Sequence, residues 1–200
     1  MPMNGDIEKA ADEAYRRAGF GLGAQAPVVL LAQRILGERA VRQLPQSVMV
    51  GTGALVRVGS HWRIYVREES PAHVKRFSVL HELAHYLLGQ SATESECDQL
   101  AAALLLPREA FRRYARPRAM WQAARVFGAS ETCAWRRVGE TFGDPVAVVT
   151  PRRVHLSGPK HPWPSESAIR MLATESRPKG LRKCLIRDDR DRAALRAVAL

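Results

Sequence analysis

Two histidines and a glutamate at positions 81 to 85 have the types and spacing of a metal hydrolase. The run His81-Glu82-Leu83-Ala84-His85 follows the H-E-x-x-H pattern. On an α-helix, residues four positions apart lie one turn apart on the same face, so both imidazoles can bind one metal ion. The glutamate then lies beside a metal-bound water, where it can act as general base. The spacing predicts a zinc site with His81 and His85 as ligands and Glu82 as base.

The third zinc ligand is expected on the helix that follows the motif. A catalytic zinc ion takes three protein ligands and keeps a fourth position for water. The following segment offers carboxylates at Glu94, Glu96 and Asp98 and a thiol at Cys97. Side chains at 96 and 100 share a helical face, so Glu96 can point inward while Leu100 anchors that face. We therefore expect Glu96 as the third ligand, with Glu94 as the next candidate.

Hydrophobic periodicity predicts the helices that position these side chains. A serine and a proline at positions 70 and 71 are good signals for the start of the motif helix, with the serine as N-cap. Gly89 is expected to end that helix as a C-cap. The expected helices cover residues 7–17, 27–36, 71–88, 94–106, 108–114, 118–127 and 130–142.

Short β-rich runs precede the motif helix. Residues 48–50, 54–58 and 62–66 are separated by glycines, and Gly59-Ser60 is typical of a tight hairpin turn. The last run is either an edge strand to which an extended peptide could add, or an interior strand with Ile64 in the core. We expect an α+β fold, mostly helical, with a small antiparallel sheet before the motif helix.

The second half of the chain is basic and less regular. Residues 1–100 hold 11 basic and 11 acidic side chains, whereas residues 101–200 hold 20 and 9, so the whole excess of +11 lies after the motif. Such a surface attracts nucleic acid or an acidic protein, although an arginine-rich solvated surface explains it equally well. Strands are expected at 146–150, 153–156 and 181–186, and helices at 165–174 and 188–200.

These elements suggest two regions: a core at 1–115, and a basic region at 116–200 with a helical C-terminal subdomain, which can belong to the same globule. The longest central apolar run, 100–106, is too short to cross a bilayer. The N-terminal segment has early acids and no apolar stretch, so no secretory signal is expected. Three scattered cysteines argue against a disulfide framework. We therefore expect a cytoplasmic protein without a membrane partner.

Two blocks of the sequence resemble the ImmA/IrrE metallopeptidases. Residues 76–88 (RFSVLHELAHYLL) are similar to the family helix R-F-x-x-A-H-E-L-G-H-x-L-L. Residues 94–107 (ESECDQLAAALLLP) are similar to its next helix, E-x-E-A-[ND]-x-F-A-x-x-L-L-M-P. Leu80, Ala84, Cys97 and Leu100 depart from the pattern, and these are packing changes that remove neither a ligand nor the base.

The resemblance implies a zincin-like zinc endopeptidase in which Glu96 matches the family's third zinc ligand. It also implies a substrate, since members of the family act on helix-turn-helix repressors and so relieve repression of mobile-element or stress genes. A different class of function is a nucleic-acid-binding regulator with a structural or vestigial zinc site. The segment from Trp121 to Gly139, with Gly128 at a turn, has the look of a helix-turn-helix, although any helix hairpin shares it.

Other side chains are weaker candidates. An oxyanion-stabilising donor is expected in such a site, and the candidates are Tyr65, Tyr86, His61 and His73, each of which surface or packing use explains as well. His155 and His161 match no zinc-ligand spacing, and we expect them to be solvent-exposed.

Overall fold

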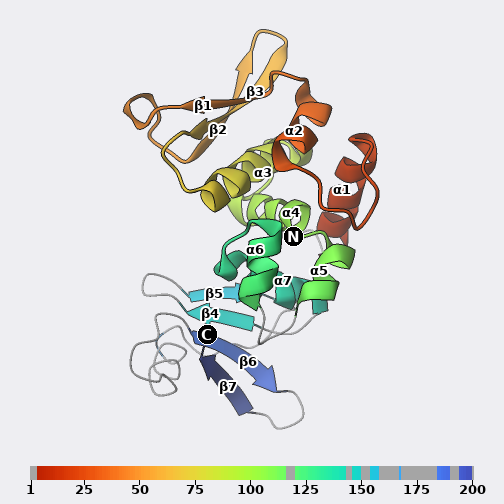
Figure 1. Ribbon diagram of the computed structural model, residues 1–200, viewed down its shortest axis with the longest axis vertical. Helices are drawn as coiled ribbons and strands as arrows, with labels where there is room; N and C mark the ends of the chain where they lie inside the picture. The colour runs from red at the N-terminus through yellow and green to blue at the C-terminus, as the bar shows by residue number, and fades with distance from the viewer. Residues whose placement is uncertain are drawn as a thin grey trace. The chain divides into compact units, whose positions relative to one another are not determined.

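The chain divides into two compact units, Met1–Ser130 and Glu131–Leu200. The computed structural model describes residues 4–115, 120–142, 146–149, 154–157, 167, 184–189 and 194–199, drawn in colour in Figure 1. The division falls after Ser130, further along the chain than the boundary expected after residue 115. That expected boundary concerns independently folding regions and stays a prediction.

Helices make up most of the first unit, as the periodicity predicts. The helix ends coincide with punctuating residues: α2 is followed by Gly37 and α3 by Gly89, both with positive φ. Pro71 rather than the preceding serine is the N-cap of α3, and it makes no side-chain cap. The helices of this unit are α1 (Asn4–Arg17), α2 (Val28–Leu36), α3 (Ala72–Leu88), α4 (Glu94–Leu105), α5 (Arg108–Tyr114) and α6 (Met120–Phe127).

The small sheet of the first unit is mixed rather than purely antiparallel. Its strands are β1 (Val41–Leu44), β2 (Gly53–Val58) and β3 (His61–Arg67), in the order β1-β3-β2. The hairpin β2–β3 forms as predicted, with Val58 opposite His61. Strand β1, which no pattern in the sequence indicated, runs parallel to β3 on its other side. The interior alternative for residues 62–66 is therefore confirmed, and β2 is an edge strand.

The strand predicted at residues 48–50 is wrong. Val48 ends a short 3₁₀ helix (η1, Gln46–Val48), and Val50 is fully exposed. The carbonyl groups of Val50 and Gly51 accept hydrogen bonds from the guanidinium of Arg67, with the Nη2 of Arg67 2.6 Å from each oxygen. The hydrogen bonds of these two carbonyl groups are thus supplied by the Arg67 side chain instead of by a neighbouring strand.

The core of the first unit lies around α3 and α4. The sheet packs on α3 through β2 and β3, while α1 packs on α4. Ile64 on β3, Leu80 and Leu83 on α3, and Leu100 on α4 have 0% exposure. Burying one such side chain contributes about 1.5–3 kcal/mol to stability. This packing fixes the two helices that carry the H-E-x-x-H motif and the acidic segment.

The second unit contains one helix and a four-stranded sheet among its described residues. Helix α7 (Glu131–Phe142) and the hairpin of β4 (Val146–Val149) with β5 (Val154–Ser157) agree with the predictions. Strand β6 (Cys184–Asp189) pairs with β4, and β7 (Ala194–Ala199) pairs with β6.

The terminal helix predicted for residues 188–200 is therefore wrong, since β6 and β7 occupy residues 184–189 and 194–199. Antiparallel pairing along the whole of β6 overrides the helical pattern of an alanine-rich segment. The helix expected at 165–174 lies outside the described residues except for Ser167. Among the helices that the structure describes, none has the length and apolar composition that a membrane span requires.

Tyr15 ties α1 to two other segments of the first unit. Its hydroxyl donates to the carbonyl of Leu104 at 2.9 Å and accepts from the amide of Ala26 at 3.4 Å. Burial, only partly offset by the Ala26 amide, raises the pKa of Tyr15 to about 12, so the hydroxyl keeps its proton. We expect Tyr15→Phe to lower the free energy of unfolding by about 1–2 kcal/mol, because both hydrogen bonds are lost.

Chemical denaturation measures this change, with Tyr114→Phe as the matched control. Tyr114 is 44% exposed, and its ring contact with Phe127 survives in phenylalanine, so its effect should stay within about 0.5 kcal/mol. Equal effects of the two substitutions would contradict a structural role for the Tyr15 hydroxyl.

Candidate metal centre

Helix α3 presents His81 and His85 side by side. Their Nε2 atoms are 3.2 Å apart, and the rings meet edge to face with centroids 4.9 Å apart. Their side chains keep 17% and 28% exposure, whereas Leu83 and Ala84 on the same helix are fully buried. The helix is thus anchored by its apolar face while the imidazoles stay accessible to solvent.

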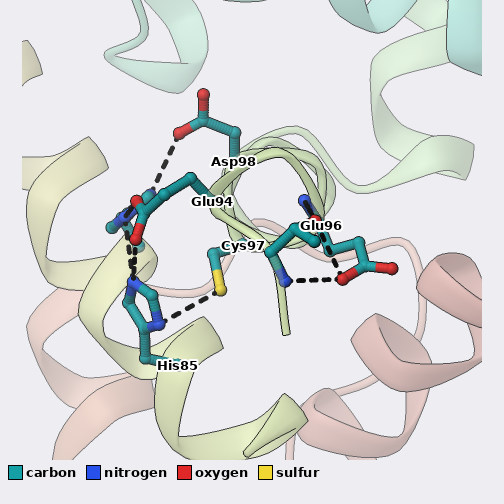
Figure 2. A network of polar contacts seen from close by, with 7 residues as sticks. His85, Glu94, Glu96, Cys97 and Asp98 are labelled. Atoms are coloured by element: carbon teal, nitrogen blue, oxygen red, sulfur yellow. Dashed lines mark hydrogen bonds and ion pairs between the residues drawn. The ribbon is translucent and has the colours of Figure 1, made fainter. Parts of the chain in front are cut away.

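Glu94, at the start of α4, completes the group of possible ligands. Its carboxylate lies 3.1 Å from Nε2 of His81 and 3.5 Å from Nε2 of His85. One ligand atom from each of the three residues lies within 4.8 Å of the others. Figure 2 shows Glu94 turned toward the histidine helix. The side chain of Glu94 is 80% exposed, so the group opens to solvent on this side.

The structure does not bring Glu96 to the histidines. Its carboxylate turns the other way (Figure 2) and accepts hydrogen bonds from the amide of Thr93 at 2.7 Å and from the hydroxyl of Thr93 at 2.9 Å. The amide of Glu96 donates back to the Thr93 hydroxyl, which completes a capping box. These bonds lower the pKa of Glu96. Glu94 therefore replaces Glu96 as the carboxylate beside the imidazoles.

The sequence contained a signal for this placement of Glu96. Thr93-x-x-Glu96 has the spacing of a capping box, which places Glu96 in the third helical position and commits its carboxylate to the helix end. In that register residues 94, 97 and 98 share one face, since helical neighbours lie three and four positions apart. Glu94, Cys97 and Asp98 all contact the histidines.

Each imidazole has a partner on its other nitrogen. Nδ1 of His81 lies 3.0 Å from a carboxylate oxygen of Asp98, and Nδ1 of His85 lies 3.3 Å from Sγ of Cys97. The hydrogen bond to Asp98 raises the pKa of His81 by more than partial burial lowers it. Neither Asp98 nor Cys97 was assigned a role from the sequence. Such outer partners fix the ring orientation and tautomer of a ligating histidine.

Glu82 lies between helix α3 and the edge strand β2. Its carboxylate accepts a hydrogen bond from the backbone amide of Leu55. A Cβ atom at Gly53 would lie 2.8 Å from Oε1 of Glu82, so only glycine leaves room for the carboxylate. Burial is the main cause that raises the pKa of Glu82, although His81 and His85 act in the opposite direction. A carboxylate with a raised pKa is a stronger base.

The donor set fits a divalent metal ion. Two imidazole nitrogens and one carboxylate oxygen converge from two helices, which is the ligand set of three-ligand catalytic zinc sites. The solvent-facing side of Glu94 leaves room for a further ligand.

The remaining sequence candidates lie elsewhere or are not brought to this group by any contact that the structure describes. Tyr86 packs its ring against Trp62, Tyr65 lies on β3, and His61 and His73 are exposed. An oxyanion donor stays unassigned. His161 and the side chain of His155 lie outside the described residues. Gly128 follows α6 with φ of 63°, but α6 and α7 belong to different units, so the helix-turn-helix stays a prediction.

Comparison with known proteins agrees with these features. The model of a peptidase family described as "IrrE N-terminal-like domain" matches residues 38–138, just over half of the chain. A solved structure titled "Mycobacterium tuberculosis transcriptional regulator" is similar in fold, with a TM-score of 0.57 and 16% identity. The similarity covers 78% of this chain and 56% of that one, so the chain spans little more than half of its neighbour. The search of curated proteins found no match.

Neutralising Glu94 should lower zinc affinity, whereas neutralising Glu96 should leave it nearly unchanged. Glu94→Gln removes a charged ligand, so we expect zinc affinity to fall at least about tenfold, as measured by competition with a chromophoric chelator. Glu96→Gln should leave zinc affinity within about threefold, because its carboxylate points away from the imidazoles, and should lower the midpoint of thermal unfolding through the weakened cap. Loss of zinc binding in Glu96→Gln alone would restore Glu96 as the ligand.

Proposed function

The chain belongs to the peptidase family described as the IrrE N-terminal-like domain, and from this premise we propose that it is a zinc-dependent endopeptidase. The observation that carries the proposal is the convergence of His81, His85 and Glu94 beside Glu82. When bound, zinc would polarise the scissile carbonyl and lower the pKa of a water ligand to about 7.

The residues of the chain divide the remaining work. His81 and His85 offer their Nε2 atoms to the metal, and Glu94 offers a carboxylate oxygen. Because the imidazoles are neutral when they bind a metal, the three ligands together carry one negative charge. Glu82 accepts a proton from the attacking water and passes it to the amine of the leaving group. Its contact with the Leu55 amide holds the carboxylate at the inner end of the site.

The position of strand β2 favours a peptide as the substrate. It lies at the edge of the sheet, next to the strand β3, and it packs on α3 where Glu82 projects. An extended peptide can add to such an edge through backbone hydrogen bonds. We propose that the scissile segment lies along β2, rather than along residues 62–66, which form the interior strand.

The proposed substrate is a transcriptional repressor of the helix-turn-helix type, cleaved so that repression of stress or mobile-element genes is relieved. The resemblance of residues 76–88 and 94–107 to the ImmA/IrrE metallopeptidases supports this choice, as does the regulatory title of the solved neighbour. The charge excess in residues 101–200 would favour a target on DNA or with an acidic surface. We further propose that the protein acts in the cytoplasm.

Glu82→Gln tests the general base. Incubation of the full chain with the product of a neighbouring repressor gene should give a discrete cut that disappears with a chelator and returns with zinc. We expect Glu82→Gln to slow cleavage by at least about a hundredfold, the usual scale of a lost general base, while zinc still binds. Glu38→Gln, a substitution on an exposed loop, should cleave like the parent protein.

The result separates the two classes of function. Cleavage by Glu82→Gln at the parent rate would contradict the base assignment. Steep salt-dependent affinity for DNA without any cleavage would instead favour a nucleic-acid-binding regulator with a structural or vestigial zinc site.

Gly53→Ala tests the fit of the base against the edge strand. The added methyl group would lie 2.8 Å from Oε1 and 3.1 Å from Cγ of Glu82, so the carboxylate must move. We expect a drop in kcat of about tenfold or more, because such misplacement of a catalytic group is costly, with zinc affinity retained. Gly21→Ala, which meets nothing within 4 Å, is the matched control. An unchanged kcat in Gly53→Ala would contradict this placement of Glu82.

A further inference from the structure

We infer that Cys97 is a positioning residue: its sulfur accepts a hydrogen bond from Nδ1–H of His85 and thereby keeps Nε2 of His85 directed at the metal. This inference rests on the proposed function, since it concerns the same metal centre.

The contact is built into the packing of α3 against α4. Sγ of Cys97 lies 3.3 Å from Nδ1 of His85, within the reach of a hydrogen bond to sulfur. Cys97 is fully buried at 0% exposure, so water does not compete for this contact. Figure 2 shows the sulfur pointing from α4 toward the His85 ring, on the same side as Glu94.

The chemistry of a neutral imidazole favours an acceptor at this place. A histidine that binds a metal through Nε2 carries its proton on Nδ1, and that N–H needs an acceptor when it is buried. In this centre the two Nε2 atoms face each other and the carboxylate of Glu94, so both Nδ1 atoms point away from the group of candidate ligands. For His81 the acceptor is Asp98 at 3.0 Å. For His85 the corresponding atom is the sulfur of Cys97.

The two acceptors differ in charge. Asp98 offers a carboxylate oxygen, whereas Cys97 offers the sulfur of a thiol, which is a weak acceptor. A third carboxylate here would add a like charge beside Glu94 and Asp98, at a cost in Coulomb energy. A thiol accepts a hydrogen bond without that repulsion, although more weakly than a carboxylate.

The test compares Cys97→Ala, which removes the acceptor, with Cys97→Ser, which keeps an acceptor of similar shape. Neither substitution is larger than cysteine, so neither overpacks the buried position 97. Zinc affinity of the full chain is measured by competition with a chromophoric chelator. We expect about a tenfold loss in Cys97→Ala, the lower end of what an outer partner of a ligand contributes, and no more than about threefold in Cys97→Ser.

A second measurement reports the hydrogen bond itself. In the zinc-loaded protein, nitrogen NMR should find the proton of His85 on Nδ1, exchanging slowly with solvent in the parent and in Cys97→Ser, and faster in Cys97→Ala. A change that only loosened packing would lower the unfolding midpoint of the zinc-free protein without altering this exchange. If Cys97→Ala does not fold, the parent and the serine variant alone decide by the same measurement.

The outcomes are distinct. Equal zinc affinity and equal Nδ1–H exchange in the parent and Cys97→Ala would overturn the inference while leaving the zinc site intact. The same holds if serine behaves as alanine does, because then the acceptor is not what matters. A parent protein that binds no zinc would instead overturn the proposed function.

Discussion

The packing of α3 against α4 is the constraint on which the rest of the site depends. Neither helix holds all the candidate ligands: α3 brings His81 and His85, and α4 brings Glu94. These three side chains come together only where the two helices are held by buried side chains such as Leu83 and Leu100. Helix α1 and the Tyr15 hydroxyl act on the site only through this packing, because α1 packs on α4 and the hydroxyl donates to the carbonyl of Leu104.

The start of α4 decides which side chains face the histidines. The capping box of Thr93 and Glu96 fixes the first turn of the helix, so residues 94, 97 and 98 lie on one face. A shift of one position would turn Glu94 and Asp98 away together. Glu96 therefore shapes the candidate site indirectly, since its carboxylate is committed to the helix end while Glu94 lies beside the imidazoles.

Local patterns predicted the helices and the β2–β3 hairpin, because their periodicity and glycine punctuation are properties of the segments themselves. They failed where partners distant in sequence decide. Strand β1 is short and depends on parallel pairing with β3, and residues 194–199 follow a helical pattern but pair with β6. Spacing alone predicts that His81 and His85 lie side by side, as they do on α3, whereas the placement of the glutamates of α4 depends on the helix cap. The roles of ligand and base stay predictions. Asp98 and Cys97 could be assigned only once the two helices were seen in contact.

The edge strand β2 and the candidate metal centre are linked through Glu82. Glu82 must stay close to the imidazoles while avoiding their ligand positions, and the Leu55 amide provides that hold from β2. The close approach is possible because residue 53 has no side chain. Arg67 donates hydrogen bonds to the carbonyl groups of Val50 and Gly51 in the preceding loop. A movement of Gly53 away from α3 would therefore strain those bonds. The sheet thus positions Glu82, the proposed base, and leaves β2 as the edge proposed for a peptide, so a displacement of β2 would alter both together.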